Sequence, residues 1–137
     1  MSALVLDSEA ISQLAGLSGP TGAAHPQAAV VAARKSETAV IVPTCVLAEV
    51  YRGTARVAAV NSWLGRNAGI QVIDTDRSIA RRVGELLHRA HLGSEHHVHA
   101  CVVALSSRYG GGVILTSDPD DINRLAAGIP NITVKGL

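Results

Sequence analysis

Aromatic residues are nearly missing from this chain, which has no Phe and only 2% of Phe, Trp and Tyr together. A hydrophobic core must therefore be built from Ala, Val, Leu and Ile, as when Ala-rich helices pack on Val- and Ile-rich strands. The same scarcity argues against binding nucleic acid by base stacking, which recruits several aromatic side chains. Trp63 is most simply a core or interface anchor.

Cysteines and long apolar runs are scarce as well. Cys45 and Cys101 lie in apolar stretches without CxxC spacing, which argues against a disulfide scaffold or a zinc ribbon and predicts buried free thiols. No apolar run approaches the ~20 residues of a membrane span, and the N-terminus lacks the basic segment of a secretory signal. These absences predict a cytoplasmic protein without membrane contact.

Charge of one sign is also lacking, since the formal net charge is +1. Any attraction for nucleic acid must come from local charge. Seven basic and three acidic residues lie between Arg52 and Arg89. Their arginines form either solvated helix faces or the rim of an RNA-binding surface, and both interpretations stay open. The rim hypothesis names Arg52, Arg56, Arg81 and Arg82.

What the chain does have is 137 residues, 47% of them hydrophobic, which is enough for one domain with its own core. Short apolar runs predict strands, and helical spacings between them predict helices. The strands are expected at 4–6, 40–42, 70–73, 113–115 and 132–134, and the helices at 8–15, 27–35, 44–51, 54–64, 76–90, 94–108 and 119–127. The stretch from Gly16 to Pro26 predicts a mobile surface loop or a poorly ordered arm. The order indicates a three-layer α/β/α fold with a parallel sheet of four to five strands.

Acidic residues stand where such a fold collects its ligands. Asp7 ends the first predicted strand and Asp118 follows the fourth, and ligands bind beyond the carboxyl ends of parallel strands. Glu49 lies near the end of the helix after the second strand, and only the fold can bring it close to them. Three carboxylates in one pocket repel one another unless a cation neutralises them. The arrangement therefore indicates a divalent-metal site.

Each of these carboxylates also has a structural interpretation. Asp7 and Asp118 precede helices, where an acid caps the first turn, and Asp118 taken singly is better explained by capping than by catalysis. Glu49 lies between apolar residues of a helix, where a salt bridge with Arg52 or Arg56 would explain it.

Four segments in register resemble the successive motifs of PIN-domain ribonucleases, and they are residues 4–8 (LVLDS), 46–50 (VLAEV), 99–105 (HACVVAL) and 115–121 (LTSDPDD). The pattern most resembles the VapC toxins of bacterial toxin–antitoxin pairs and covers essentially the whole chain. The resemblance implies a single PIN domain over residues 1–137. It also implies an acidic quartet that holds Mg²⁺ or Mn²⁺, mapping to Asp7, Glu49, the position of His99 and Asp118, with Asp121 as a candidate outer member.

The third position departs from the family pattern, because His99 stands where Asp is usual. Magnesium prefers oxygen ligands, whereas imidazole suits zinc, nickel, iron and copper better. Glu95 precedes His99 by four residues, so on one helix its carboxylate is placed to reach the same pocket. The histidines, especially His88 with His91 and the group of His96, His97 and His99, also raise the hypothesis of a zinc site. Without cysteines or HExxH at metal spacing, a polar, solvated helix–loop–helix corner is the more economical interpretation.

Two functional hypotheses follow. The first is a VapC-type endoribonuclease toxin, in which Asp7 and Asp118 bind the metal directly and Glu49 binds it through water or orients the nucleophile. Its implied partners are a VapB-like antitoxin, an RNA substrate such as tRNA or rRNA, and a second copy in a homodimer. The second hypothesis is a catalytically weakened PIN domain that binds antitoxin or RNA without turnover, because His99 replaces an acid.

Overall fold

The structure is a computed structural model and describes residues 2–19 and 23–137. Within these residues, five strands form one sheet in the order β3-β2-β1-β4-β5, and every neighbouring pair is parallel. The strands are β1 (Ala3–Leu6), β2 (Ala39–Pro43), β3 (Gln71–Ile73), β4 (Gly112–Thr116) and β5 (Ile132–Gly136). The predicted α/β class and parallel sheet are confirmed.

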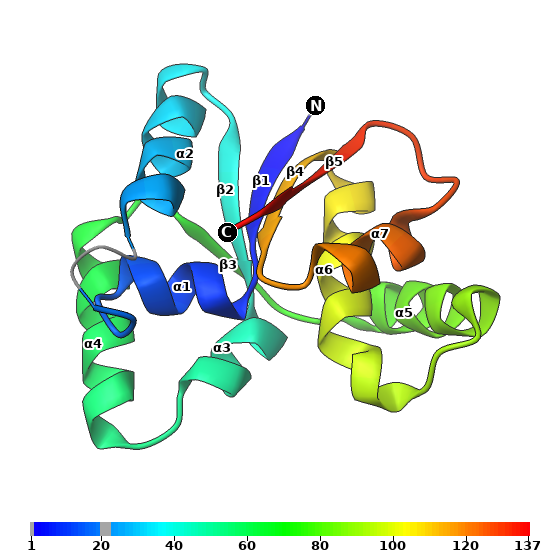
Figure 1. Cartoon of the computed structure of the whole chain (residues 1–137), viewed down its shortest axis with the longest axis horizontal. Coiled ribbons are helices and arrows are strands. Elements are labelled where there is room, and N and C mark those ends of the chain that lie inside the picture. Colours follow the sequence, from blue (N-terminus) through cyan, green and yellow to red (C-terminus); the bar gives the residue numbers. More distant parts are fainter. Residues whose placement is uncertain (1, 20–22) are drawn as a thin grey trace.

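Helices cover both faces of this sheet. They are α1 (Ser8–Leu14), α2 (Ala24–Lys35), α3 (Thr44–Val50), α4 (Thr54–Arg66), α5 (Arg77–Ala90), α6 (His97–Arg108) and α7 (Pro119–Ala126), with a short 3-10 turn η1 (Ser94–His96) before α6. Figure 1 shows α1 to α4 on one side of the sheet and α5 to α7 on the other. This is the expected three-layer α/β/α arrangement.

The expected loop over residues 16–26 is partly wrong. Helix α2 already begins at Ala24, so the last residues of that range are helical, while residues 20–22 lie outside the described part of the chain. Pro26 is the third residue of α2 and is buried. In the first helical turn the backbone N–H that proline lacks has no partner to lose, so Pro26 begins a helix here instead of preventing one.

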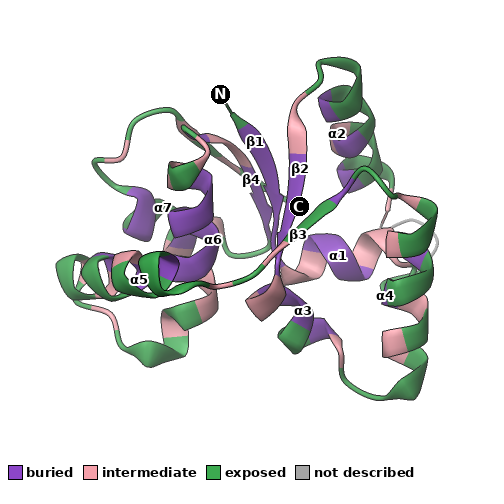
Figure 2. Cartoon of the chain, turned by 180° about the vertical axis from the view of Figure 1, so that it is seen from behind, coloured by how far each residue is buried: buried purple, intermediate pink, exposed green. Residues whose placement is uncertain are grey.

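Strand β1 and helix α6 form the centre of the core. All four residues of β1 are buried, as are residues 100–106 of α6. Figure 2 shows these buried segments lying side by side in the middle of the molecule. Small and branched aliphatic side chains fill this centre, as the scarcity of aromatic residues required.

The order in which the chain adds strands to the sheet reverses between β1 and β4. From β1 the chain adds β2 and β3 on one side, and it later returns to add β4 and β5 on the other. The pairing of Leu6 with Leu115 brings the carboxyl ends of the two strands level, and the Asp7 N–H extends this ladder by donating to the Leu115 carbonyl at 3.0 Å. Open α/β sheets bind ligands in the crevice beyond such a reversal.

The cysteines are free, as predicted, but only Cys101 on α6 is fully buried, whereas Cys45 is half-buried. The contact between the two thiols lowers the pKa of Cys101, and the same contact together with burial raises the pKa of Cys45. None of the helices in the described part of the chain is long and apolar enough to cross a membrane.

Asp76 ties the start of α5 to the end of α6. Its Oδ1 accepts the Ile79 N–H at 2.8 Å, and its two oxygens accept from Arg108 Nη2 at 2.9 and 3.0 Å. The hydrogen bonds from Arg108 lower the pKa of Asp76 below its usual 3.8. Because the folded-state pKa is depressed, this contribution to stability is present above the unfolded pKa and is lost as the pH falls through the folded one.

We expect Asp76→Asn to lower the melting temperature at neutral pH, with a difference that shrinks as the pH falls below 3.8. The loss is modest because the ion pair is exposed to solvent. Thermal unfolding followed by circular dichroism across the acid range checks this. Asp74→Asn is the control, since Asp74 is exposed and makes no ion pair with the described residues. Equal melting temperatures of Asp76→Asn and Asp74→Asn across the pH range would contradict a stabilising role of the ion pair between Asp76 and Arg108.

Candidate active site

Asp7 lies at the carboxyl end of β1 and is 2% exposed. Its Oδ1 accepts the Ser8 N–H at 2.8 Å, and its Oδ2 accepts the Thr116 hydroxyl at 2.7 Å. The capping interpretation is therefore correct for Asp7, which caps α1. Capping alone does not account for the second bond, which holds the carboxylate against the end of β4. Desolvating a carboxylate is costly, and these donors offset that cost.

Asp118 follows β4, and its backbone N–H donates to the Thr116 hydroxyl at 3.0 Å. Its side chain makes no capping hydrogen bond with α7, although Asp118 occupies the N-cap position, so the capping interpretation is wrong for this residue. The carboxylate is 55% exposed, and its Oδ2 lies 3.3 Å from Nε2 of His99. Asp118 therefore faces solvent on one side and His99 on the other.

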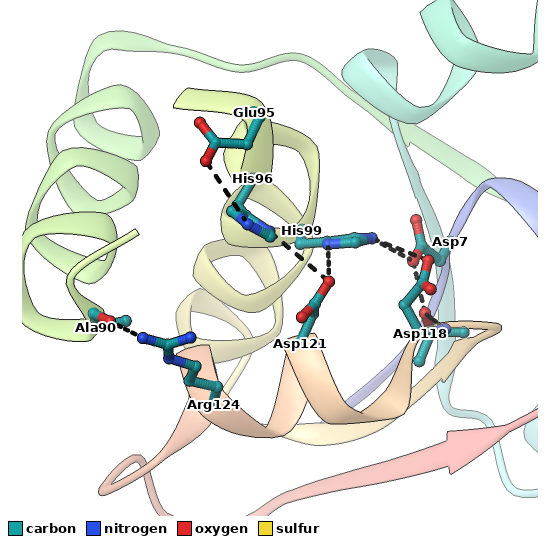
Figure 3. A network of polar contacts seen from close by, with 9 residues as sticks. Asp7, Ala90, Glu95, His96, His99, Asp118, Asp121 and Arg124 are labelled. Atoms are coloured by element: carbon teal, nitrogen blue, oxygen red, sulfur yellow. Dashed lines mark hydrogen bonds and ion pairs between the residues drawn. The ribbon is translucent and has the colours of Figure 1, made fainter. Parts of the chain in front are cut away.

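His99 lies in the first turn of α6 among three carboxylates (Figure 3). Its Nε2 is 3.3 Å from Oδ2 of Asp118 and 3.9 Å from Oδ2 of Asp7. Its Nδ1 is 3.7 Å from Oδ2 of Asp121, which is in the first turn of α7. This Nδ1 atom is buried and has no hydrogen-bond partner among the described residues. The structure thus brings together Asp7, His99, Asp118 and Asp121 as the sequence predicts.

Glu95 does not join this group. It precedes α6 in the 3-10 turn η1, and its Oε1 lies 3.9 Å from Nε2 of His96. Figure 3 shows Glu95 on the far side of His96 from Asp7. The expectation that Glu95 reaches the pocket of His99, four residues later, required both residues to lie on one continuous α-helix. The 3-10 turn instead changes the direction of the Glu95 side chain.

Glu49 makes no ion pair with His99, unlike Asp7, Asp118 and Asp121. It is exposed on α3 and makes no ion pair or side-chain hydrogen bond with the described residues. The expected salt bridge is absent, because Arg52 donates to the Ala48 carbonyl at 3.3 Å and Arg56 to the Val50 carbonyl at 3.2 Å. A catalytic or metal-binding role of Glu49 stays a prediction.

The four candidate RNA-binding arginines belong to two regions. Arg52 and Arg56 flank the junction of α3 and α4, whereas Arg81 and Arg82 lie on α5. Figure 1 shows α4 and α5 on opposite sides of the sheet. Arg81 and Arg82 both pair with Glu85, at 3.5 and 3.4 Å. A role of the four arginines in RNA binding stays a prediction. Because the two pairs lie on opposite sides of the sheet, each pair would bind RNA separately.

The comparison with protein families is decisive for the fold, because the PIN domain model matches residues 4–128. The chain belongs to the PIN domain family. No curated protein matches its sequence. A chain of the VapBC2 complex from Rickettsia felis, bound to a DNA fragment from its promoter, has a TM-score of 0.67 at 14% identity over 98% of both chains. A chain of DNA-bound VapBC from Salmonella typhimurium has a TM-score of 0.61 at 15% identity over 99% of this chain and 98% of that one. At such identities the likeness concerns the fold.

One residue of this PIN domain site, Thr116, was missed in the sequence, and His96 was considered only as one of several histidines in a zinc hypothesis, without Asp121. The Thr116 hydroxyl donates to Asp7 and accepts from the backbone of Asp118, so it links the two strand ends. Its place two residues before Asp118, at the end of a buried strand, was the available signal. His96 lies with its Nδ1 3.7 Å from Oδ2 of Asp121, and its spacing of three residues from His99 was the signal for a shared helix face.

Proposed function

We propose that this PIN domain is the toxin of a VapBC-type pair, an endoribonuclease that hydrolyses RNA phosphodiesters with a divalent metal ion and is held inactive by a VapB-like antitoxin. The observation that carries the proposal is the convergence of Asp7, Asp118 and Asp121 on His99 at the carboxyl ends of β1 and β4. Two VapBC complexes contain a chain with the same fold, which supports an antitoxin partner.

The donors at this edge fit a divalent cation. Three carboxylates that converge on one ring repel one another without added positive charge. Asp7 and Asp118 offer the oxygen ligands that Mg²⁺ and Mn²⁺ accept, with Asp121 as an outer member and Glu49 binding through water or orienting the nucleophile, while the nitrogen of His99 suits Mg²⁺ less well. Such an ion, when bound, supplies a water of lowered pKa and stabilises charge on the phosphate.

The residues of the chain position these donors. Ser8 and Thr116 hold the two oxygens of Asp7, so the carboxylate keeps one orientation before any ligand arrives. Preorganised donors of this kind cost no rearrangement during the reaction. Asp118 is 55% exposed, which makes its side of the pocket the approach for an RNA phosphate.

The finer parts of the proposal rest on the resemblance to VapC toxins. They are a single domain over residues 1–137, an RNA substrate of the tRNA or rRNA kind, a homodimer and a cytoplasmic location. The sheet supports the single domain, since β1 begins at Ala3 and β5 ends at Gly136 in the same sheet.

A second candidate function is a PIN domain that binds antitoxin or RNA without turnover. The observation in its favour is the position of the His99 ring, with Nε2 between Oδ2 of Asp118 and Oδ2 of Asp7. The ring occupies the space between the two carboxylates that bind the cation in the first candidate, and it replaces an oxygen donor with nitrogen.

Cleavage of a mixed tRNA and rRNA preparation with Mg²⁺ or Mn²⁺ separates the two candidates. We expect the parent chain to cleave and EDTA to stop it. His99→Asp is expected to raise the Mg²⁺-dependent rate on the order of tenfold, because it restores an oxygen donor. Cleavage by His99→Asp alone would establish the weakened PIN domain instead. No cleavage by either the parent chain or His99→Asp would contradict the nuclease proposal and leave the family assignment intact.

A further inference from the structure

A second cluster of metal-binding side chains lies on the other edge of the His99 ring. His96 ends η1, His99 follows in the first turn of α6, and Asp121 is in the first turn of α7. The spacing of three residues puts both imidazoles on one side of the helix, with ring centres 6.2 Å apart. Figure 3 shows both rings reaching towards the Asp121 carboxylate.

The distances in this cluster are somewhat longer than those between ligands around an ion. The Nδ1 atoms of His96 and His99 each lie 3.7 Å from Oδ2 of Asp121. That separation is too long for a hydrogen bond. It is close to the roughly 3.4 Å between two ligand atoms held at about 2.05 Å by a tetrahedral ion. All three ligand atoms lie within 4.8 Å of one another, so a small closure completes three corners of a tetrahedron.

The opposite edge of each ring faces a carboxylate. Nε2 of His99 lies 3.3 Å from Oδ2 of Asp118, and Nε2 of His96 lies 3.9 Å from Oε1 of Glu95. Metal-binding histidines commonly direct their second ring nitrogen to a carboxylate, which fixes the tautomer and leaves the other nitrogen free for the metal. In that tautomer Nδ1 of His99 is a buried acceptor without a hydrogen-bond partner among the described residues, and an ion would satisfy it.

We propose that His96, His99 and Asp121 bind one Zn²⁺ ion, on the opposite edge of the His99 ring from Asp7. Two imidazoles and one carboxylate are a donor set that suits Zn²⁺ and leaves a fourth position for water or substrate. Mg²⁺, which prefers oxygen ligands, fits this set poorly. Asp121 is 42% and His96 23% exposed, so the fourth position opens to solvent.

The proposal revises the interpretation of the histidines as a solvated corner. His96 and His99 alone are too few for a zinc site, and the third ligand comes from α7, after the intervening strand β4. The ion would join the first turns of α6 and α7. The site shares His99 and Asp121 with the pocket of the nuclease proposal, but its test is independent of that proposal, because Zn²⁺ binding is measured without RNA cleavage.

Metal binding to the untagged, EDTA-treated full chain tests the proposal. We expect one equivalent of Co²⁺ to give the visible absorption of a four-coordinate site, and Zn²⁺ to displace it while a large excess of Mg²⁺ does not. His96→Ala is expected to weaken Zn²⁺ binding, measured by competition titration, about a hundredfold. His97→Ala is the matched control, because His97 is the adjacent exposed histidine and lies outside the cluster. Its affinity is expected to stay within about threefold of the parent's.

Two outcomes would overturn the site. One is a parent chain that binds Co²⁺ and Zn²⁺ no better than Mg²⁺, and the other is parent-like Zn²⁺ affinity in His96→Ala. If His96→Ala does not fold, Asp121→Asn takes its place, because it keeps the size of the side chain and removes the ligand charge. Asp7→Asn is expected to retain Zn²⁺ binding even where it has lost cleavage, so failure of the nuclease proposal is distinguishable from failure of the zinc site.

Discussion

Asp7→Asn is expected to abolish metal-dependent RNA cleavage, with a loss of about 10²- to 10⁴-fold, since an ion-binding group contributes several kcal/mol to the transition state. Asp7 is the most buried carboxylate of the site, and Ser8 and Thr116 hold both of its oxygens. Asparagine has nearly the same shape, but it removes the negative charge and replaces one oxygen with an amide nitrogen. Single-turnover cleavage of labelled RNA with saturating Mg²⁺ or Mn²⁺ measures the loss.

The matched control is Asp120→Asn. Asp120 is exposed in the first turn of α7, beside Asp121, and makes no ion pair with the described residues. The Asp120→Asn substitution removes the same charge from the same region. We expect its cleavage rate to stay within about twofold of the parent's, because a surface charge outside the pocket contributes little. An active Asp7→Asn would refute the carboxylate pocket, and an inactive Asp120→Asn would show a general charge effect. If the parent is inactive, the same pair is tested in the His99→Asp background.

Gly112→Ala is expected to destabilise the fold strongly, by about 2–6 kcal/mol. Gly112 begins β4 with a φ of +121°, which L side chains rarely adopt, and a Cβ there would overlap the backbone carbonyl oxygen of Ala3 on β1. Neither backbone can move away, because Ala3 pairs with Gly112 in the sheet and donates to the Gly111 carbonyl at 3.0 Å. Strain and overlap each cost about 1–3 kcal/mol, against a total stability of about 5–15 kcal/mol for a domain. Soluble yield and urea unfolding measure the effect.

Gly128→Ala separates the two costs. Gly128 has a φ of +81°, and a Cβ there meets nothing within 4 Å. This variant therefore carries the backbone cost without the overlap, and we expect it to fold with a loss of about 1 kcal/mol. Equal losses in the two variants would show that the contact with Ala3 is not the reason for the glycine at position 112.

Much of the fold could be predicted because its signals are local. The buried strands are continuous apolar runs, and the alternation of strands with helical spacings permits few arrangements other than a parallel sheet between two helical layers. Pro26 shows where local evidence failed. A proline next to a Gly- and Ser-rich stretch indicates a loop, yet in the first turn of α2 the same residue is compatible with a helix.

For the site, the sequence alone was sufficient to place Asp7 and Asp118 at one edge of the sheet, because both follow strands and parallel strands end together. It was not sufficient to show which side chains meet there. Glu49 and Glu95 make no ion pair with His99 among the described residues, whereas Thr116 joins the two strand ends and His96 shares Asp121 with His99. Helix periodicity fixes neighbours within one helix. Contacts between α6, α7 and the ends of β1 and β4 depend on the strand order and on how the helices pack, which only the tertiary structure decides.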